Sequence, residues 1–230
     1  MQMQLRTLGL RLRRWLLLLA EGFFLVSLLG VLLFRLVPPP FTWLMVKRSL
    51  EGDAPRHALL WGQYVPLSEM PKSLQRAVIA SEDQKFATHM GFDFEAIWKV
   101  MQMNAYSQKL RGASTISQQT AKNVFLWPTR NFLRKGLEAW FTVLIELYWP
   151  KQRILELYLN CIETGPGLYG AEAWAQHYFQ KSVRKLNPWE AALLAACLPN
   201  PRRWHPGAIR PFIRQKQGWI IWQMQYMELP

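Results

Sequence analysis

Hydrophobic residues fall into one long block near the beginning of the chain and a series of periodic segments after residue 70. They are almost continuous from Trp15 to Val37, a length that exceeds the roughly 20 residues a membrane-spanning helix needs. From Pro71 onward, apolar residues recur at the spacing of helix faces, in runs that Gly, Pro and Asn interrupt. Short alternating runs at regular spacing, typical of strands, are not seen. The pattern predicts a mainly α-helical protein with one N-terminal transmembrane helix.

Charged residues flank the apolar block unevenly. Four arginines between positions 6 and 14 precede it, and the positive-inside rule places that end in the cytoplasm. A signal peptide is the alternative, but no small-x-small cleavage site follows the block, which ends in Arg35 and Pro38–Pro40. We therefore predict an uncleaved membrane anchor and an exported domain. The expected parts are a cytoplasmic tail at 1–14, the anchor at 15–37, a linker at 38–50 and the domain at 51–230.

Two predicted helices frame a polar stretch from Ser81 to Asp93. The first runs from Pro71 to Ala80, and the second begins after Asp93, a suitable N-cap. Between them lie two adjacent carboxylates, Glu82 and Asp83, followed by an aromatic residue, a histidine and a glycine. Such pairs at helix ends are usually solvated or capping residues. A glutamate at a helix-to-loop junction is also well placed to act as a general base.

A second polar segment runs from Ser114 to Asn123. Thr115 and Gln118 fit a capping box, which would make the segment a well-formed helix start. The same helix start, with Lys122 two turns further on, could instead form a cradle for phosphate oxygens. The sequence leaves both interpretations open.

Basic residues dominate the middle of the chain. Between Glu95 and Glu138 there is no acidic residue, and the aromatic residues there are interleaved with cations. Together with a net charge of +13 and twelve tryptophans, this predicts a bilayer-associated site for an anion attached to an apolar group. The cations of this stretch are Lys99, Lys109, Arg111, Lys122, Arg130, Arg134 and Lys135.

A long helix is predicted from Arg134, and Pro150 ends it. Arg134 and Glu138 stand at i, i+4, which on a surface would be an ordinary ion pair of a few tenths of a kcal/mol. The helix beyond Glu138 is apolar nearly all round, which predicts that it is buried. A carboxylate facing two cations at the head of a buried helix would line a cleft.

The remaining segments are expected to be helical with one glycine turn. The turn lies at 163–167, and helices are predicted up to Phe179 and from Asn187 onward. The tail from 209 to 227 is basic and aromatic, so it either packs on the domain or lies on the bilayer. Cys161 and Cys197 show neither metal-ligand nor redox spacing, and the neighbours of Cys197 favour a buried, inert thiol.

Four segments in this order resemble the bacterial peptidoglycan glycosyltransferases, glycosyltransferase family 51, which form the transglycosylase domain of class A penicillin-binding proteins. The resemblance covers residues 66 to 205, and the single anchor resembles the monofunctional biosynthetic members. The segments are Ser81–Asp93, Gly112-x-Ser114-Thr115-Ile116-x-Gln118-Gln119, Arg134-Lys135-x-x-Glu138 and Lys151-x-x-Ile154-Leu155-Glu156-x-Tyr158-Leu159-Asn160.

The resemblance implies a lysozyme-like helical fold, with a larger lobe and a smaller membrane-associated lobe, outside the cytoplasmic membrane. The implied reaction joins lipid II, a disaccharide-pentapeptide on undecaprenyl pyrophosphate, into β-1,4 glycan with inversion and release of undecaprenyl pyrophosphate. Glu82 would be the general base, and Glu138 would act at the donor pyrophosphate, directly or through Mg²⁺ or Mn²⁺. The implied substrate-binding residues are Asp83, Ser114, Gln118, Lys122, Arg130, Arg134 and Lys135.

The implied partners are lipid II, the growing lipid-linked glycan, membrane lipid, and cell-wall synthesis or division proteins. Nucleic acid is not expected on the exported side of a membrane. Three other functions fit parts of the sequence less well. They are a membrane-anchored muramidase or lytic transglycosylase, a scaffold that binds lipid II, and a transpeptidase suggested by Ser182-Val183-Arg184-Lys185, whose companion motifs are missing.

Overall fold

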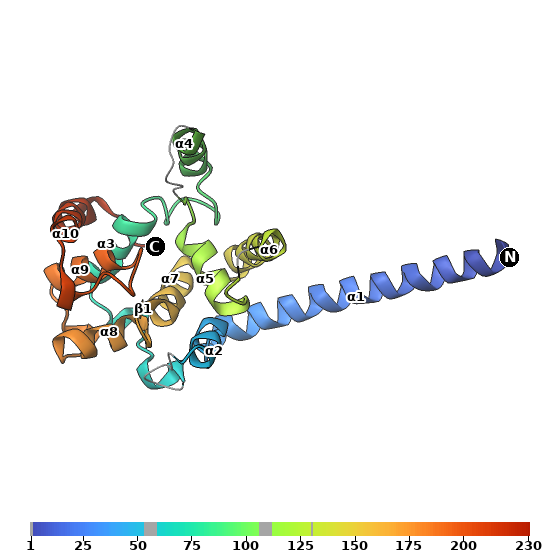
Figure 1. Ribbon diagram of the computed structural model, residues 1–230, viewed down its shortest axis with the longest axis horizontal. Helices are drawn as coiled ribbons and strands as arrows, with labels where there is room; N and C mark the ends of the chain where they lie inside the picture. The colour runs from blue at the N-terminus through green and yellow to red at the C-terminus, as the bar shows by residue number, and fades with distance from the viewer. Residues whose placement is uncertain (1, 53–58, 106–111, 130) are drawn as a thin grey trace. The chain divides into compact units, whose positions relative to one another are not determined.

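The computed structural model describes residues 2–52, 59–105, 112–129 and 131–230. Helices make up most of this part of the chain, and its only sheet is a two-stranded hairpin (Figure 1). The mainly α-helical class predicted from the hydrophobic periodicity is therefore confirmed. The chain divides between residues 37 and 38 into two compact units.

The first unit is a single helix, α1 (Gln2–Leu36). Its segment Leu10–Leu36 has a mean hydropathy of 2.5 and is long and apolar enough to cross a membrane. By length and composition it is the only such helix among the described residues. The predicted N-terminal apolar helix is confirmed, and it fits membrane anchoring. It begins earlier than predicted because the leucines and arginines ahead of Trp15 are themselves good helix formers.

The second unit begins with a helix in the stretch that the sequence suggested as a linker. Helix α2 (Trp43–Leu50) is capped by Thr42, whose hydroxyl accepts a hydrogen bond from the Met45 amide at 3.2 Å. Met45 is buried, and α2 packs against α5 (Ile116–Phe125). These contacts make α2 part of the compact domain.

One group of helices forms around α9 (Pro188–Cys197), which α3 (Lys72–Glu82) and α10 (Pro211–Gln223) both contact (Figure 1). Helix α9 is rich in fully buried alanines, which allow close approach of the neighbouring helices. The structure supports the packed alternative for the C-terminal tail. Helix α3 ends two residues later than predicted, so Glu82 is its last residue.

A second group consists of α5, α6 (Phe132–Tyr148), α7 (Lys151–Cys161) and α8 (Gly170–Phe179). Between α7 and α8, strands β1 (Glu163–Gly165) and β2 (Leu168–Tyr169) form the predicted glycine turn as an antiparallel hairpin. Helix α4 (Phe94–Ala105) stands away from both groups (Figure 1). Short 3₁₀ turns complete the described chain at Leu60–Gln63, Leu67–Glu69, Val183–Lys185, Pro206–Ala208 and Met224–Tyr226.

Helix α6 corrects one prediction. It was expected to be buried nearly all round, but only Glu138, Thr142, Leu144 and Ile145 are buried. Its opposite face exposes 97% of Phe132 and 64% of Leu147, with Val143 and Tyr148 also exposed. The prediction was wrong because α5 covers one face of α6, whereas an apolar pattern does not reveal whether protein covers the other.

The start of α3 is anchored by α7. The amide side chain of Asn160 bonds both backbone groups of Val65, at 2.9 Å each. Glu156 accepts a further bond from the Leu67 amide at 2.7 Å. The segment that leads into α3 is thus held by side chains from a helix about 90 residues away in sequence.

Gly170 is a site where substitution should unfold the protein. Its φ is +82°, and an added Cβ would lie 2.7 Å from the Asn160 carbonyl oxygen. We expect Gly170→Ala to lower the free energy of unfolding by about 3 kcal/mol or more, from strain plus overpacking. Gly52→Ala is the matched control, since Gly52 has φ +83° and nothing within 4 Å of the added Cβ. Urea denaturation of both variants measures the difference, and equal losses would contradict the steric argument.

Candidate active site

Two adjoining pockets lie in the second unit. The α3 pocket, of about 330 Å³, is lined by the end of α3, the loop after it, α4 and the residues ahead of α5. The α6 pocket, of about 550 Å³, is lined by α5, α6, α2 and the turn after α9. Glu82 lines the first and Glu138 the second, while Ser114 lines both. The two predicted carboxylates therefore face neighbouring pockets that meet at Ser114.

Glu82 ends α3 with its side chain half-buried. The Gln119 side-chain amide donates to Glu82 Oε2 at 3.1 Å. The Ser81 hydroxyl lies 3.2 Å from Glu82 Oε1 and 3.0 Å from the Ala195 carbonyl, so its one proton is shared between them. The carboxylate is oriented by these donors and still faces the pocket, as a general base must.

Gln119 is held in turn by Tyr158 of α7. The Tyr158 hydroxyl donates to Gln119 Oε1 at 3.4 Å, which turns the NH₂ group of the amide toward Glu82. Tyr158 is fully buried. Burial, with smaller effects of the Glu82 and Asp83 charges, raises the pKa of Tyr158 well above its ordinary value. The phenol therefore stays protonated and acts as a fixed donor behind Glu82.

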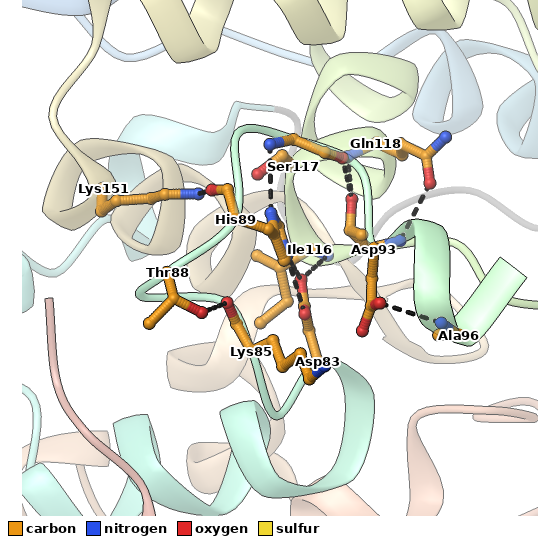
Figure 2. Close-up of polar contacts among 12 residues, drawn as sticks. Asp83, Lys85, Thr88, His89, Asp93, Ala96, Ile116, Ser117, Gln118 and Lys151 are labelled. Atoms are coloured by element: carbon orange, nitrogen blue, oxygen red, sulfur yellow. Dashed lines mark hydrogen bonds and ion pairs between the residues drawn. The ribbon is translucent and has the colours of Figure 1, made fainter.

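Asp83 lines the α3 pocket, but its carboxylate is bound by other parts of the protein. Its carboxylate accepts hydrogen bonds from His89 Nε2, at 2.9 and 3.0 Å, and from the Ile116 amide at 2.9 Å (Figure 2). The side chain is only 2% exposed. It joins the end of α3 to the beginning of α5. These contacts favour a positioning role over the predicted role in substrate binding, which stays a prediction.

The hydrogen bonds of His89 assign its tautomer. The Gly91 amide donates to His89 Nδ1 at 3.0 Å, so the ring proton is assigned to Nε2, which donates to Asp83. The Thr115 hydroxyl donates to the Gly91 carbonyl at 2.7 Å. An added Cβ at Gly91 would lie 2.7 Å from Thr142 on α6. The loop after Glu82 is therefore packed directly against the elements that form the other pocket.

A partly buried ion pair completes the support of this loop. The Lys151 ammonium donates to the His89 carbonyl at 2.6 Å (Figure 2). It also pairs with Glu146 at 2.8 Å. The Ser117 hydroxyl also donates to Glu146. Helices α5, α6 and α7 thus meet at the loop that follows Glu82.

The start of α5 forms the predicted cap and also lines the α6 pocket. The Gln118 amide donates to the Thr115 hydroxyl at 3.2 Å, and the Thr115 amide donates to Gln118 Oε1 at 3.0 Å, so the predicted capping box is confirmed. The Gln118 NH₂ group takes no part in that cap. Gln118, Ser114 and Lys122 all line the α6 pocket. The amides of Ile116 and Gln118 are already taken by Asp83 and Thr115, so an anion in this pocket would meet the side chains of the lining residues and not these amides.

Glu138 is 3% exposed and is paired with two cations of its own helix. Arg134 lies 2.6 Å from one carboxylate oxygen, and Lys135 contacts the other. Together with Lys122 on α5, they line the α6 pocket. The pair therefore lines a cleft, as its sequence context predicted. Arg130, which was also predicted to bind substrate, lies outside the described residues.

Comparison with known proteins identifies the family. The sequence matches the model of the transglycosylase family over residues 56–225, most of the chain. This chain belongs to the transglycosylase family.

Relatives with curated names match nearly the whole transglycosylase chain. A protein of Stutzerimonas stutzeri is 51% identical over 224 residues, covering 97% of this chain and 91% of the relative. One of Shewanella oneidensis is 49% identical over 217 residues, with 93% and 91% covered. One of Bdellovibrio bacteriovorus is 53% identical over 200 residues, with 84% and 77% covered. All three are named biosynthetic peptidoglycan transglycosylase.

The described residues of this transglycosylase do not form a metal site on their own. Among them, no three His, Cys, Asp or Glu side chains are grouped closely enough to hold an ion. Both oxygens of Glu138 already contact cations. Mg²⁺ or Mn²⁺ beside Glu138 would have to displace them and take its other ligands from the substrate. These residues do not fit a protein-held metal.

Sequence reasoning missed two residues around Glu82. Gln119 could have been found as the second member of the Gln118-Gln119 pair. Lys216 on α10 is half-buried, and burial lowers its pKa while the charges of Glu82 and Cys197 oppose that shift. No sequence signal links Lys216 to Glu82, because the two meet only when α10 packs on α3.

The two cysteines take no part in either pocket. Both are free and buried. Burial raises the pKa of Cys161 and of Cys197 to about 12, so both stay protonated at neutral pH. The prediction that Cys197 is a buried, inert thiol agrees with this environment.

Proposed function

We propose that this transglycosylase polymerises lipid II into β-1,4-linked glycan, with inversion at the donor carbon and release of undecaprenyl pyrophosphate. The supporting observation is the pair of pockets that meet at Ser114, one with an oriented carboxylate and the other with a carboxylate among cations. The printed names of the relatives, which specify peptidoglycan, support the substrate class.

The α3 pocket would take the acceptor sugar. Its 4-hydroxyl would lie against Glu82, which removes the proton as the oxygen attacks the donor carbon. Gln119 and Ser81 hold the carboxylate in place throughout. Since the base is positioned before substrate binds, little reorganisation accompanies the step.

The α6 pocket would take the pyrophosphate of the donor. Lys122, Arg134 and Lys135 stabilise the negative charge that grows on the leaving group as the bond to carbon breaks. Glu138 holds Arg134 and Lys135 in the pocket between turnovers. Placing the base and the leaving-group cations in different pockets suits displacement with inversion, as in inverting glycosidases, with a sugar hydroxyl in place of water.

The orientation of the domain follows from the sequence flanking the anchor. We propose that α1 holds the protein in the inner membrane, with the arginines before Trp15 in the cytoplasm and the domain on the outer face. In this orientation the domain would meet lipid II and the growing glycan at the outer surface of the membrane.

The test is to supply labelled lipid II to the full chain in detergent. We expect long polymer that a muramidase digests. Shortening of preformed glycan without polymer would favour a muramidase. Retention of lipid II without any product would favour a scaffold.

Lys135→Ala should weaken binding of the donor. Lys135 is half-exposed at the pocket and contacts Glu138, so its removal takes a cation from the pyrophosphate site without opening the core. We expect the KM for lipid II to rise about tenfold, the effect of losing one charge-assisted hydrogen bond. Lys72→Ala, on the exposed face of α3, is the control and should leave the KM unchanged. Steady-state polymerisation at varied lipid II measures both.

A further inference from the structure

Asn123 of α5 is a buried amide without a hydrogen-bonding partner. It is only 8% exposed, and its side chain makes no hydrogen bond to any of the described residues. Every other Ser, Thr, Asn, Gln, Asp or Glu side chain that is buried in the described part of the second unit makes at least one. Buried amides are normally paired, so this exception requires an explanation.

The α6 pocket supplies that explanation. Asn123 is one of the residues that line this pocket of about 550 Å³. Its amide is not sealed inside the protein, because the unpaired side-chain nitrogen and oxygen atoms that are closed off from solvent belong to other residues. The carboxamide of Asn123 therefore faces the space that a substrate would fill. It does not belong to the set of substrate-binding residues predicted from the sequence.

One face of α5 carries Asn123 into the middle of the site. Asn123 stands at i+4 from Gln119, which bonds Glu82, so the two amides lie on the same face with their Cβ atoms about 6 Å apart. Its neighbour Lys122 lines the same pocket, on the side proposed to hold the pyrophosphate. A group bound by Asn123 would thus lie close both to the reacting carbon and to the leaving group.

The two ends of a carboxamide need different partners. The NH₂ group of Asn123 donates, whereas Oδ1 accepts and needs a proton donor. The oxygens of an ionised pyrophosphate diester only accept, so they can satisfy the NH₂ group but leave Oδ1 unpaired. The sugars of peptidoglycan carry 2-acetamido groups, and in the donor this group is on the carbon next to the one that bears the pyrophosphate. Its N–H is the nearest proton donor to the phosphates.

We propose that Asn123 is a specificity-determining residue of the donor site, which accepts a hydrogen bond at Oδ1 from the 2-acetamido N–H of the pyrophosphate-linked sugar and donates from its NH₂ group to a phosphate oxygen. The inference rests on the proposed function, since that function supplies a donor with this group. A site built to bond an N–H discriminates against an analogue without it, because a buried polar atom is then left unpaired. Asn123 would therefore select an N-acetylated sugar at the reacting carbon.

The experiment compares two labelled lipid II analogues that differ only at C2 of the pyrophosphate-linked sugar. One keeps the acetamido group, and the other carries an acetate ester, which retains the carbonyl but has an oxygen in place of the N–H. The 4-hydroxyl of the terminal sugar is methylated in both, so they act only as donors, and unlabelled lipid II is the acceptor. We expect the wild-type kcat/KM to be about tenfold lower for the ester, as for the loss of one buried hydrogen bond.

Asn123→Leu should remove this discrimination. Leucine has nearly the size of asparagine but has no polar atom in its side chain. We expect the variant to use the acetamido analogue about tenfold less efficiently than the wild type does, and to use the two analogues equally well. Gln152→Leu is the matched control, because it removes an exposed amide of α7 that lines neither pocket, and it should keep the tenfold preference. Urea denaturation shows whether both variants are folded.

The outcomes separate this contact from the wider function. Equal kcat/KM of the wild type for the two analogues would overturn the proposal, whether or not the variants fold. A preference that survives in Asn123→Leu would overturn it too, because another group would then bind the N–H. Failure of the wild type to polymerise unmodified lipid II would instead refute the proposed function.

Discussion

Glu82→Gln should abolish polymerisation of lipid II while leaving the substrate bound. Glutamine has the shape of glutamate and keeps an oxygen for the Gln119 or Ser81 donor, but it cannot accept a proton. General base catalysis typically contributes between about a hundredfold and ten thousandfold. We expect kcat to fall by about a thousandfold or more, with little change in affinity for lipid II.

The measurement pairs single-turnover polymerisation with a binding assay on the same preparation. Glu69→Gln is the matched control, because Glu69 is a half-exposed carboxylate paired with Arg184 and lines neither pocket. Its activity should equal that of the wild type. Full activity of Glu82→Gln would exclude Glu82 as the base, and loss of binding would assign it a different role.

Glu138→Gln, in the α6 pocket, should lower the turnover rate without weakening the binding of lipid II. The substitution frees Arg134 and Lys135 from their shared carboxylate. Both cations can still pair with the pyrophosphate of the bound substrate, but they are no longer held where negative charge develops on the leaving group. Binding of the ground state is kept while stabilisation of the transition state is lost, and only the second sets the rate of the chemical step. We expect kcat to fall about a hundredfold or more, with a KM that is unchanged or lower.

Steady-state kinetics with and without a chelator measure this variant. If Glu138 acts only by holding Arg134 and Lys135, chelation of divalent metal changes the wild type and Glu138→Gln equally. A chelator effect that is large in the wild type and lost in the variant would assign Glu138 to a metal supplied with the substrate. A raised KM with unchanged kcat would contradict the electrostatic argument altogether.

Local sequence signals predicted most of the helices and their ends. The Thr115–Gln118 box, the Asp93 cap and the glycine turn after α7 were all predicted, because each depends on atoms within a few residues of one another. The burial of α6 was wrong, because burial depends on the neighbours a helix acquires and not on its own residues.

The same distinction between local sequence and tertiary packing applies to the candidate active site. The sequence by itself determined which residues could act as base, carboxylate and cations, since Glu82, Glu138 and Lys135 occur in recognisable local motifs. Only the tertiary structure decided which side chains meet. Gln119 reaches Glu82 from another helix, Asp83 caps α5 across 33 residues, and Arg48, Glu163 and Arg202 converge from three distant elements. Helix caps arise from interactions between near neighbours in the chain, so the local sequence predicts them. A pocket arises from packing between distant segments, and the sequence does not specify which of these lie close together in space.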